Sequence, residues 1–255
     1  MPQSADQNIR YVIEDKLFII QIHRPEKKNA LLPSMYKALA DGIKLADATD
    51  SVNAVLLRGT DDCFTSGNDV NSFVAAGTDS GERPSVQFML ALTNAKKPIV
   101  AAISGLAIGI GTTLLFHCDL VYAADTCFLQ LPFTRLGLCP EAGSSYLLPR
   151  QIGYQRAAEL LLLGRRFTAE QAREYGIVTA VLTQDQYLNH ALTQAHDLAN
   201  LPSDAVQTSK RLMKLAMQQA LPKTIDLELG EFGRLLQTED AQAIMQAFLN
   251  KKKAS

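Results

Sequence analysis

A single carboxylate, Glu141, stands in a stretch of the chain that is otherwise apolar or small. No other charged residue lies between Arg135 and Arg150. A carboxyl group buried among apolar residues loses hydration, so its conjugate base becomes a better proton acceptor. The pattern is that of a general base. Taken alone, however, the stretch favours a simpler interpretation, an acid placed by the dipole of a helix that Pro140 predicts to begin there.

Two glycine-bearing turns upstream reverse that preference. One is the segment 64–69, with Gly67 at the mouth of a predicted helix, and the other places Gly109 and Gly111 between a predicted strand and helix. Glycine allows a close backbone approach, and the first turn of a helix has N–H groups without intrahelical partners. The second turn is not a dinucleotide fingerprint, because Leu114 stands where the third glycine would be. Together with Glu141, the turns predict two backbone donors for an oxyanion and one base beside them.

The elements that must position these residues alternate along the first half of the chain. Two short strands are predicted within residues 9–23, then a helix at 33–48 and a buried strand at 53–58, which complete a β–α–β unit. Further elements are predicted as follows: a helix at 84–95 and strands at 99–103, 119–124 and 128–131. After Glu141 helices dominate, and the segment 177–182 is the only predicted strand. The pattern indicates an α/β protein with a helical C-terminal region.

The chain is predicted to divide into a core, residues 1–199, and a helical region, residues 200–255. The helical spacing after residue 200 exposes more apolar side chains than a free-standing region could keep in water. This region is therefore expected to pack against the core or a neighbouring subunit. The small and polar residues 74–83 predict an entrance loop.

Composition excludes several classes of function. The 255 residues carry a net charge of −1, which argues against a nucleic-acid-binding surface. No apolar run reaches the length of a membrane-spanning helix, so no membrane partner is expected. The four cysteines form no CxxC pair and have no histidine cluster, so no metal site is expected. Without a secretory leader in this sequence, free thiols and a cytoplasmic location are expected.

Three segments carry a resemblance to a known family. They are FTSGNDVNSF at 64–73, KKPIVAAISGLAIGIGTTLLFHCDLVYAAD at 96–125 and FLQLPFTRLGLCPEAGSSYLLPRQIG at 128–153. In this order and spacing the chain resembles the enoyl-CoA hydratase/isomerase, or crotonase, superfamily over about residues 8–250, with further support from HRPEKKNAL at 23–31. The resemblance implies a spiral of ββα units with a helical C-terminal trimerisation region. It also implies homotrimers or dimers of trimers.

The resemblance also assigns roles to residues of the expected site. It places the donors to a thioester enolate at the main-chain N–H groups of Asn68 and Ile110. At the second of these positions isoleucine replaces the commoner glycine, and its side chain should narrow the pocket. The two glutamates of typical hydratases fall at Thr113 and Phe133, so hydration by the usual route should be lost. Glu141 matches the motif of the Δ3,Δ2-enoyl-CoA isomerase branch that is similar to the peroxisomal enzymes. The implied activity is isomerisation of 3-enoyl-CoA in fatty acid β-oxidation, without a metal or redox cofactor.

By resemblance, the acyl-CoA substrate should lie along the loop 24–30 and the segment 66–69, with its acyl chain in an apolar tunnel. The residues expected to bind it are Arg24, Lys27, Lys28, Ala30, Ser66, Gly67, Asp69, Gly109, Phe133 and Leu138. The alternative to substrate binding is, for each cation, a solvated charge on the surface. For each apolar residue the alternative is packing in the hydrophobic core.

Two other functions remain open from the sequence. The same fold could carry out another acyl-CoA reaction, residual hydration or thioester hydrolysis, with Glu141 activating water. The chain could also be a non-catalytic CoA-binding subunit, although a decayed site would not need an isolated acid. The acyl chain length and the choice between trimer and hexamer are not determined by the residues.

Overall fold

The computed structural model describes residues 2–69 and 83–253. The predicted entrance loop at 74–83 lies outside these residues, apart from Arg83, which precedes the first turn of helix α3.

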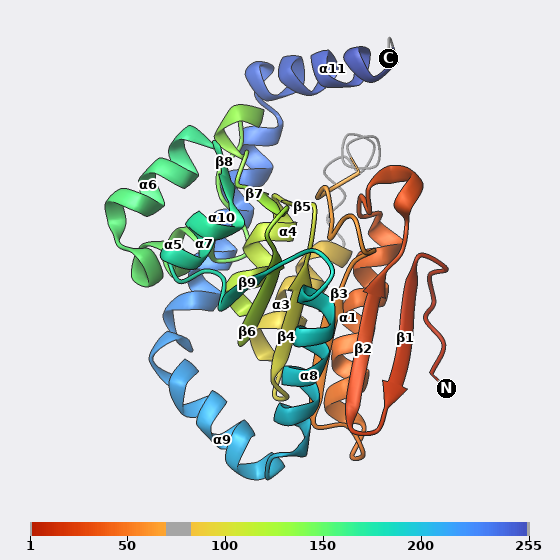
Figure 1. Ribbon diagram of the computed structural model, residues 1–255. Coiled ribbons are helices and arrows are strands. Elements are labelled where there is room, and N and C mark those ends of the chain that lie inside the picture. The colour runs from red at the N-terminus through yellow and green to blue at the C-terminus, as the bar shows by residue number, and fades with distance from the viewer. Residues whose placement is uncertain (1, 70–82, 254–255) are drawn as a thin grey trace.

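A six-stranded sheet forms the centre of the molecule (Figure 1), with the strand order β1-β2-β3-β4-β6-β9. Its strands are β1 (Ile9–Glu14), β2 (Leu17–Ile22), β3 (Ala54–Arg58), β4 (Ile99–Ile103), β6 (Leu120–Ala124) and β9 (Ala180–Leu182). Only the pair β1–β2 is antiparallel; every later pairing is parallel. All five residues of β4 are buried, as expected for a parallel strand covered on both faces.

Helices cover both faces of this sheet (Figure 1). Helices α1 (Pro33–Ala48) and α3 (Pro84–Asn94) lie on one face, and α8 (Tyr187–Asn200) lies on the other. On the α8 face, alanines at every fourth position, Ala191, Ala195 and Ala199, pack against the sheet. Residues four apart share one face of a helix, and their small side chains allow α8 to approach the strands closely. The helix predicted at 33–48 is confirmed with the same bounds.

A smaller sheet, β5-β7-β8, stands beside the first. Its strands are β5 (Leu106–Ile108), β7 (Phe128–Gln130) and β8 (Arg166–Thr168). The prediction of a single strand after Glu141 is therefore wrong. Strand β8 has three residues, of which only Phe167 is buried, so it is too short to show a period of two. Its conformation is set by antiparallel pairing with β7.

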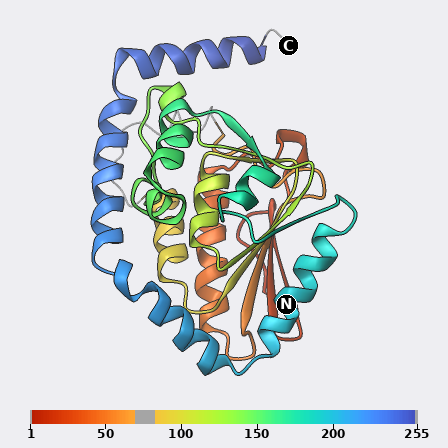
Figure 2. The same cartoon turned by 60° about the vertical axis from the view of Figure 1, so that its left-hand side comes forward.

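Most of the remaining elements are helical. They are η1 (Pro25–Lys27), α4 (Ile110–Thr113), η2 (Leu114–His117), η3 (Thr134–Leu136), α5 (Ser144–Ile152), α6 (Tyr154–Leu163), α7 (Ala169–Glu174), α9 (Ser203–Lys214), η4 (Leu215–Met217), α10 (Ala220–Leu236) and α11 (Glu239–Lys253). Helix α11 lies at the top of the molecule in both Figures 1 and 2.

The region after residue 200 packs against the core, as the sequence predicts. Leu221 and Ile225 of α10 form a buried cluster with Leu147 of α5. Ala241 and Met245 of α11 join the main hydrophobic core. The boundary near residue 200 falls between α8 and α9, and the division into two domains stays a prediction.

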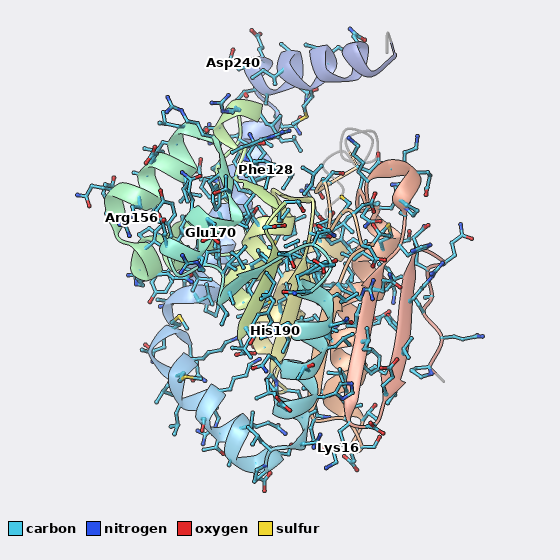
Figure 3. The ribbon with its side chains drawn as sticks, viewed as in Figure 1. Lys16, Phe128, Arg156, Glu170, His190 and Asp240 are labelled. Atoms are coloured by element: carbon cyan, nitrogen blue, oxygen red, sulfur yellow. The ribbon has the colours of Figure 1, made fainter. Side chains whose placement is uncertain are left out.

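Charged side chains such as Lys16, Arg156 and Asp240 stand on the outside of the molecule (Figure 3). Within residues 2–69 and 83–253, no helix is long and apolar enough to cross a membrane. The same residues hold no group of three or more His, Cys, Asp or Glu side chains arranged to bind a metal ion.

A buried ion pair attaches α9 to the sheet. Lys210 Nζ lies 2.7 Å from Asp119 Oδ2 and donates to the Lys97 carbonyl oxygen at 2.8 Å. The same Asp119 oxygen accepts from the Ile99 N–H at 2.7 Å, at the start of β4. The lysine side chain is only 4% exposed and that of Asp119 is 17% exposed. Removing one partner of such a pair leaves a charge without compensation in a poorly solvated site.

Lys210→Met should therefore destabilise the protein by about 3 kcal/mol, because the Asp119 carboxylate would lose its partner. The measurement is urea unfolding followed by circular dichroism. The matched control is Lys37→Met, which removes the exposed i,i+4 pair with Asp41 and should cost about 0.5 kcal/mol or less. Equal effects of the two substitutions would contradict a structural role for the buried pair.

Candidate active site

The Glu141 carboxyl group is buried, with 5% of the residue exposed. Its Oε1 accepts a hydrogen bond from Thr113 Oγ1 at 2.5 Å. Burial raises the pKa of Glu141 from its ordinary value to about 8, the Thr113 hydrogen bond opposes this rise, and the Glu228 carboxylate adds to it. A raised pKa makes the Glu141 carboxylate a stronger proton acceptor, while its role as a general base stays a prediction.

The backbone after Glu141 is held in an uncommon conformation. Ala142 has φ 57° and Gly143 φ 73°, both in the left-handed region. For alanine this costs on the order of 1 kcal/mol, and hydrogen bonds on both sides offset the cost. The Glu141 carbonyl oxygen accepts from Ser144 Oγ at 2.7 Å. The Ala142 carbonyl oxygen accepts from His117 Nε2 at 2.7 Å.

His117 is a neutral hydrogen-bond donor in this arrangement. Burial lowers its pKa to about 4, so the imidazole carries no charge near neutral pH. The carbonyl oxygen can only accept, which places the proton on Nε2. Nothing in the sequence signals this role of His117, because its partner, the carbonyl of Ala142, is 25 positions away.

The first predicted oxyanion donor, the Asn68 N–H, follows a glycine in the left-handed region, Gly67, with φ 88°. The segment before it runs beside β5: Thr65 N–H donates to the Leu106 carbonyl at 2.8 Å, and Ile108 N–H to the Thr65 carbonyl at 3.1 Å. A Cβ atom on Gly67 would lie 2.7 Å from the Ile108 carbonyl oxygen. Glycine is therefore needed for the close approach of the two segments.

The second predicted donor, the Ile110 N–H, follows Gly109, whose φ of 58° and ψ of −118° suit only glycine. Gly109 N–H is itself held by the Gln130 carbonyl at 2.9 Å. Ile110 opens the short helix α4, which ends at Thr113. One four-residue helix thus carries a predicted donor at its start and the hydrogen-bond partner of Glu141 at its end.

Within the described part of the chain, neither predicted donor is used in a hydrogen bond. Among the described residues, the N–H groups of Asn68 and Ile110 donate to no acceptor. The N–H groups on either side of Asn68 are paired. Gly67 N–H donates to Thr65 Oγ1 at 3.1 Å, and Asp69 N–H donates to the Leu31 carbonyl at 3.0 Å. Unpaired backbone donors near a base can stabilise an enolate oxygen, and this role of Asn68 and Ile110 stays a prediction.

Tyr36 is a site residue that the sequence analysis missed. Its hydroxyl donates to Asn68 Oδ1 at 2.6 Å, and its ring packs against Phe88 with centroids 5.9 Å apart. Burial, and then the charge of Glu141, raise its pKa well above the ordinary value. Its side chain thus links α1 to the first donor. From the sequence, Tyr36 fits the buried face of the helix 33–48, and nothing in its spacing signals the contact.

Three of the residues predicted to bind substrate come together in one ion-paired contact. Arg24 Nη1 lies 2.9 Å from Asp69 Oδ2 and donates to the Ala30 carbonyl oxygen at 2.9 Å. The Arg24 side chain is only 13% exposed and that of Asp69 only 7%. Lys27 and Lys28 are exposed. A contact of these five predicted residues with coenzyme A stays a prediction.

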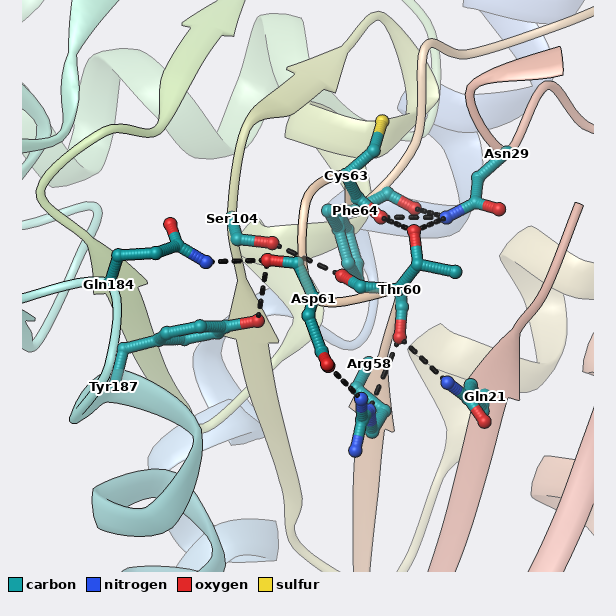
Figure 4. Close-up of polar contacts among 11 residues, drawn as sticks. Gln21, Asn29, Arg58, Thr60, Asp61, Cys63, Phe64, Ser104, Gln184 and Tyr187 are labelled. Atoms are coloured by element: carbon teal, nitrogen blue, oxygen red, sulfur yellow. Dashed lines mark hydrogen bonds and ion pairs between the residues drawn. The ribbon is translucent and has the colours of Figure 1, made fainter. Parts of the chain in front are cut away.

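Asn29, which the sequence analysis did not single out, holds this loop in place (Figure 4). Its Nδ2 donates to the Cys63 carbonyl at 2.6 Å and to Thr60 Oγ1 at 3.0 Å. Its Oδ1 accepts from the Arg24 N–H at 2.7 Å. Because Asn29 is fully buried, these hydrogen bonds have no competition from water. They fix residues 24–30 against the loop segment 60–64, which leads to Asn68.

Of the other predicted binding residues, Ser66 lies in the segment before Asn68, and Phe133 and Leu138 lie in the hydrophobic core. Ser66 N–H donates to the Lys28 carbonyl at 3.0 Å, which joins the two segments expected to bind coenzyme A. Phe133 and Leu138 are buried in the main hydrophobic core, together with Ile110. Their contact with an acyl chain stays a prediction.

Similar proteins include both isomerases and hydratases. The chain is 34% identical over 241 residues to enoyl-CoA delta isomerase 2 of Rattus norvegicus, covering 92% of this chain and 61% of that protein. It is 31% identical over 244 residues to a probable enoyl-CoA hydratase of Rhizobium meliloti, covering 94% of each. The chain thus spans about three-fifths of the delta isomerase 2 relative and nearly all of the hydratase relative.

Solved structures share the fold over almost the whole chain. The structure of Pseudomonas aeruginosa OdaA is 41% identical, with a TM-score of 0.93, over 95% of this chain and 99% of that one. An enoyl-CoA hydratase/isomerase from Pseudoalteromonas atlantica is 36% identical, with a TM-score of 0.92, over 96% and 98%. The predicted crotonase-like α/β fold is confirmed. A family model for enoyl-CoA hydratase/isomerase matches residues 13–255. By its sequence and its fold, the chain belongs to the enoyl-CoA hydratase/isomerase family.

Proposed function

We propose that this protein is a Δ3,Δ2-enoyl-CoA isomerase. The observation that carries the proposal is the position of Glu141, whose carboxyl contacts the end of helix α4 while the first residue of that helix supplies an unpaired N–H. The positions of the two hydratase glutamates hold Thr113 and Phe133, which cannot transfer a proton to or from water. The similarity to delta isomerases supports the proposal.

The mechanism uses one base and two donors. The thioester carbonyl oxygen accepts hydrogen bonds from the N–H groups of Asn68 and Ile110. The Glu141 carboxylate removes a proton from C2 of a 3-enoyl-CoA, and the resulting dienolate carries its charge on the thioester oxygen. Glu141 then returns the same proton to C4, and the double bond moves to the 2-position. Because the proton is returned, the reaction balances without a metal or redox cofactor.

Thr113 supports this cycle without taking part in proton transfer to carbon. Its hydroxyl donates to Oε1 of Glu141, which stabilises the carboxylate and leaves Oε2 for the substrate. A pKa of about 8 keeps both the charged and the protonated form of Glu141 accessible. A base that must receive and return one proton in each turnover needs both forms.

We also propose that the protein assembles as a trimer or a dimer of trimers. Large apolar side chains of the C-terminal region, Leu212, Met213, Leu215 and Leu227, are more than half exposed. Burial of such residues against a second copy would remove apolar surface from water.

Glu141→Gln should abolish most isomerase activity, with a loss of about 10²–10⁴-fold, because glutamine cannot accept the C2 proton. The measurement is the ultraviolet absorbance of the conjugated 2-enoyl thioester that forms from a trans-3-enoyl-CoA. The control is Glu159→Gln, at an exposed position on α6. Near wild-type turnover in the Glu141 variant would remove this residue from the mechanism.

Measurements of 2-enoyl-CoA consumption, free thiol and acyl-CoA binding with the same protein separate the competing reactions. A hydratase would consume 2-enoyl-CoA, a thioester hydrolase would release free thiol, and a non-catalytic subunit would bind acyl-CoA without turnover. Any of these results in the absence of double-bond migration would reject the proposal.

Ile110→Pro should lower kcat by about 10²–10³-fold, because proline has no N–H to donate to the thioester oxygen. Proline is compatible with the first position of a helix, so α4 is expected to form. The control is Ile110→Val, which retains the N–H and most of the buried side chain. If the proline variant kept both its fold and its turnover, the second donor would not act on the substrate.

The isomerase rate should rise with pH and level off above about pH 8. Only the carboxylate accepts a proton, and Glu141 with its pKa of about 8 is mostly protonated at lower pH. Below that value kcat should fall about tenfold per pH unit. The measurement is kcat at saturating substrate from pH 6 to pH 9.5. A rate that stays constant between pH 6 and pH 8 would show that Glu141 ionises at a much lower pH.

A further inference from the structure

A second buried carboxylate lies close to Glu141 and comes from the C-terminal region. Glu228 of α10 is 7% exposed. It accepts hydrogen bonds from the Gly143 N–H at 2.6 Å, the Ser145 N–H at 2.9 Å and the Ser145 hydroxyl. These donors stand two and four positions after Glu141, while Glu228 itself is 85 positions beyond Gly143.

Glu228 completes the start of helix α5. Gly143 precedes the first turn of α5, and no side chain of that turn caps it. The Glu228 carboxylate takes this place from another helix and lies at the positive end of the α5 dipole. Burial raises the pKa of Glu228, and the hydroxyl and the two backbone N–H groups oppose this rise. They also fix Gly143 and the left-handed turn that follows Glu141.

The groups that face Glu141 come from four elements. Tyr36 of α1 and Thr113 of α4 are neutral there, because burial keeps the phenol protonated. His117 of η2, which binds the next carbonyl, is neutral with a pKa of about 4. Among these described groups, Glu228 of α10 is the other acid. After burial, which is the larger cause, repulsion between the two carboxylates also raises the pKa of Glu141.

We propose that Glu228 is a positioning residue for Glu141: it holds the turn that aims the base, and its negative charge makes ionisation of the base less favourable. The part that concerns catalysis rests on the proposed isomerase function. The electrostatic effect of Glu228 on Glu141 does not depend on that function, because it is a property of the folded site. The negative charge of Glu228 disfavours ionisation of Glu141, and it makes the Glu141 carboxylate a stronger base. The C-terminal helix α10 thereby takes part in the chemistry of the core.

The test is Glu228→Gln, which removes the charge and keeps one of the two carboxylate oxygens that accept from the N–H groups of α5. The matched control is Glu231→Gln on the same helix, whose exposed carboxylate pairs with Arg234. Both variants are titrated by infrared spectroscopy. The carbonyl band of the protonated Glu141 carboxyl is identified by its absence in Glu141→Gln.

In the wild type and in the Glu231 variant the band should disappear with a midpoint near pH 8. In Glu228→Gln the midpoint should move to lower pH, and the midpoint of the kcat profile should fall with it. An unchanged infrared midpoint in a folded Glu228 variant would overturn the proposal. Since the infrared titration needs no turnover, a shifted band in a protein without isomerase activity would reject the proposed function and support the coupling.

A second variant keeps the test decisive if Glu228→Gln fails to fold. Ser145→Ala changes an exposed residue and deletes one donor to Glu228, which makes the Glu228 charge less favourable. Its midpoint should shift in the same direction by a smaller amount. A midpoint equal to that of the wild type would then overturn the proposal.

Discussion

The Glu141 carboxyl is buried, and a buried carboxylate loses hydration free energy that only its surroundings can replace. The surroundings replace only a small part of this hydration free energy, because the Thr113 hydroxyl is the one hydrogen-bond donor to the carboxyl among the described residues. The incomplete compensation is what makes the group a strong base. A site with several donors would hold a stable carboxylate that has little tendency to take a proton.

The rest of the active-site architecture consists mainly of backbone. The glycines at 67 and 109 adopt conformations that side chains disfavour, and they turn two N–H groups away from the hydrogen bonds of the sheet. Their positions depend on the small sheet, because β5 pairs with β7 on one side and lies beside residues 64–66 on the other. The short helix α4 then connects this sheet to the base. Fold and chemistry therefore depend on the same few hydrogen bonds.

The sequence predicted those features that depend on residues close together in the chain. The proline at 33 and the apolar spacing after it gave the bounds of α1, and an acid isolated among apolar residues indicated Glu141. The missed features depend on partners far away in the chain. Strand β8 exists because β7 pairs with it, and the roles of Tyr36, Asn29 and Glu228 come from contacts with residues 31 to 85 positions away. The Arg24–Asp69 pair is a similar case, since both were predicted to face the substrate and neither spacing nor charge indicated that they would meet.

The proposed use of main-chain donors at Asn68 and Ile110 has a consequence for how such a site can evolve. An N–H group is present whatever side chain the residue carries, provided that it is not proline. The side chains at these two positions can therefore change through successive generations without loss of the oxyanion contact. New acyl groups can be selected by altering the walls of the pocket while the reaction intermediate stays the same, and a single ancestral scaffold can give rise to many enzymes.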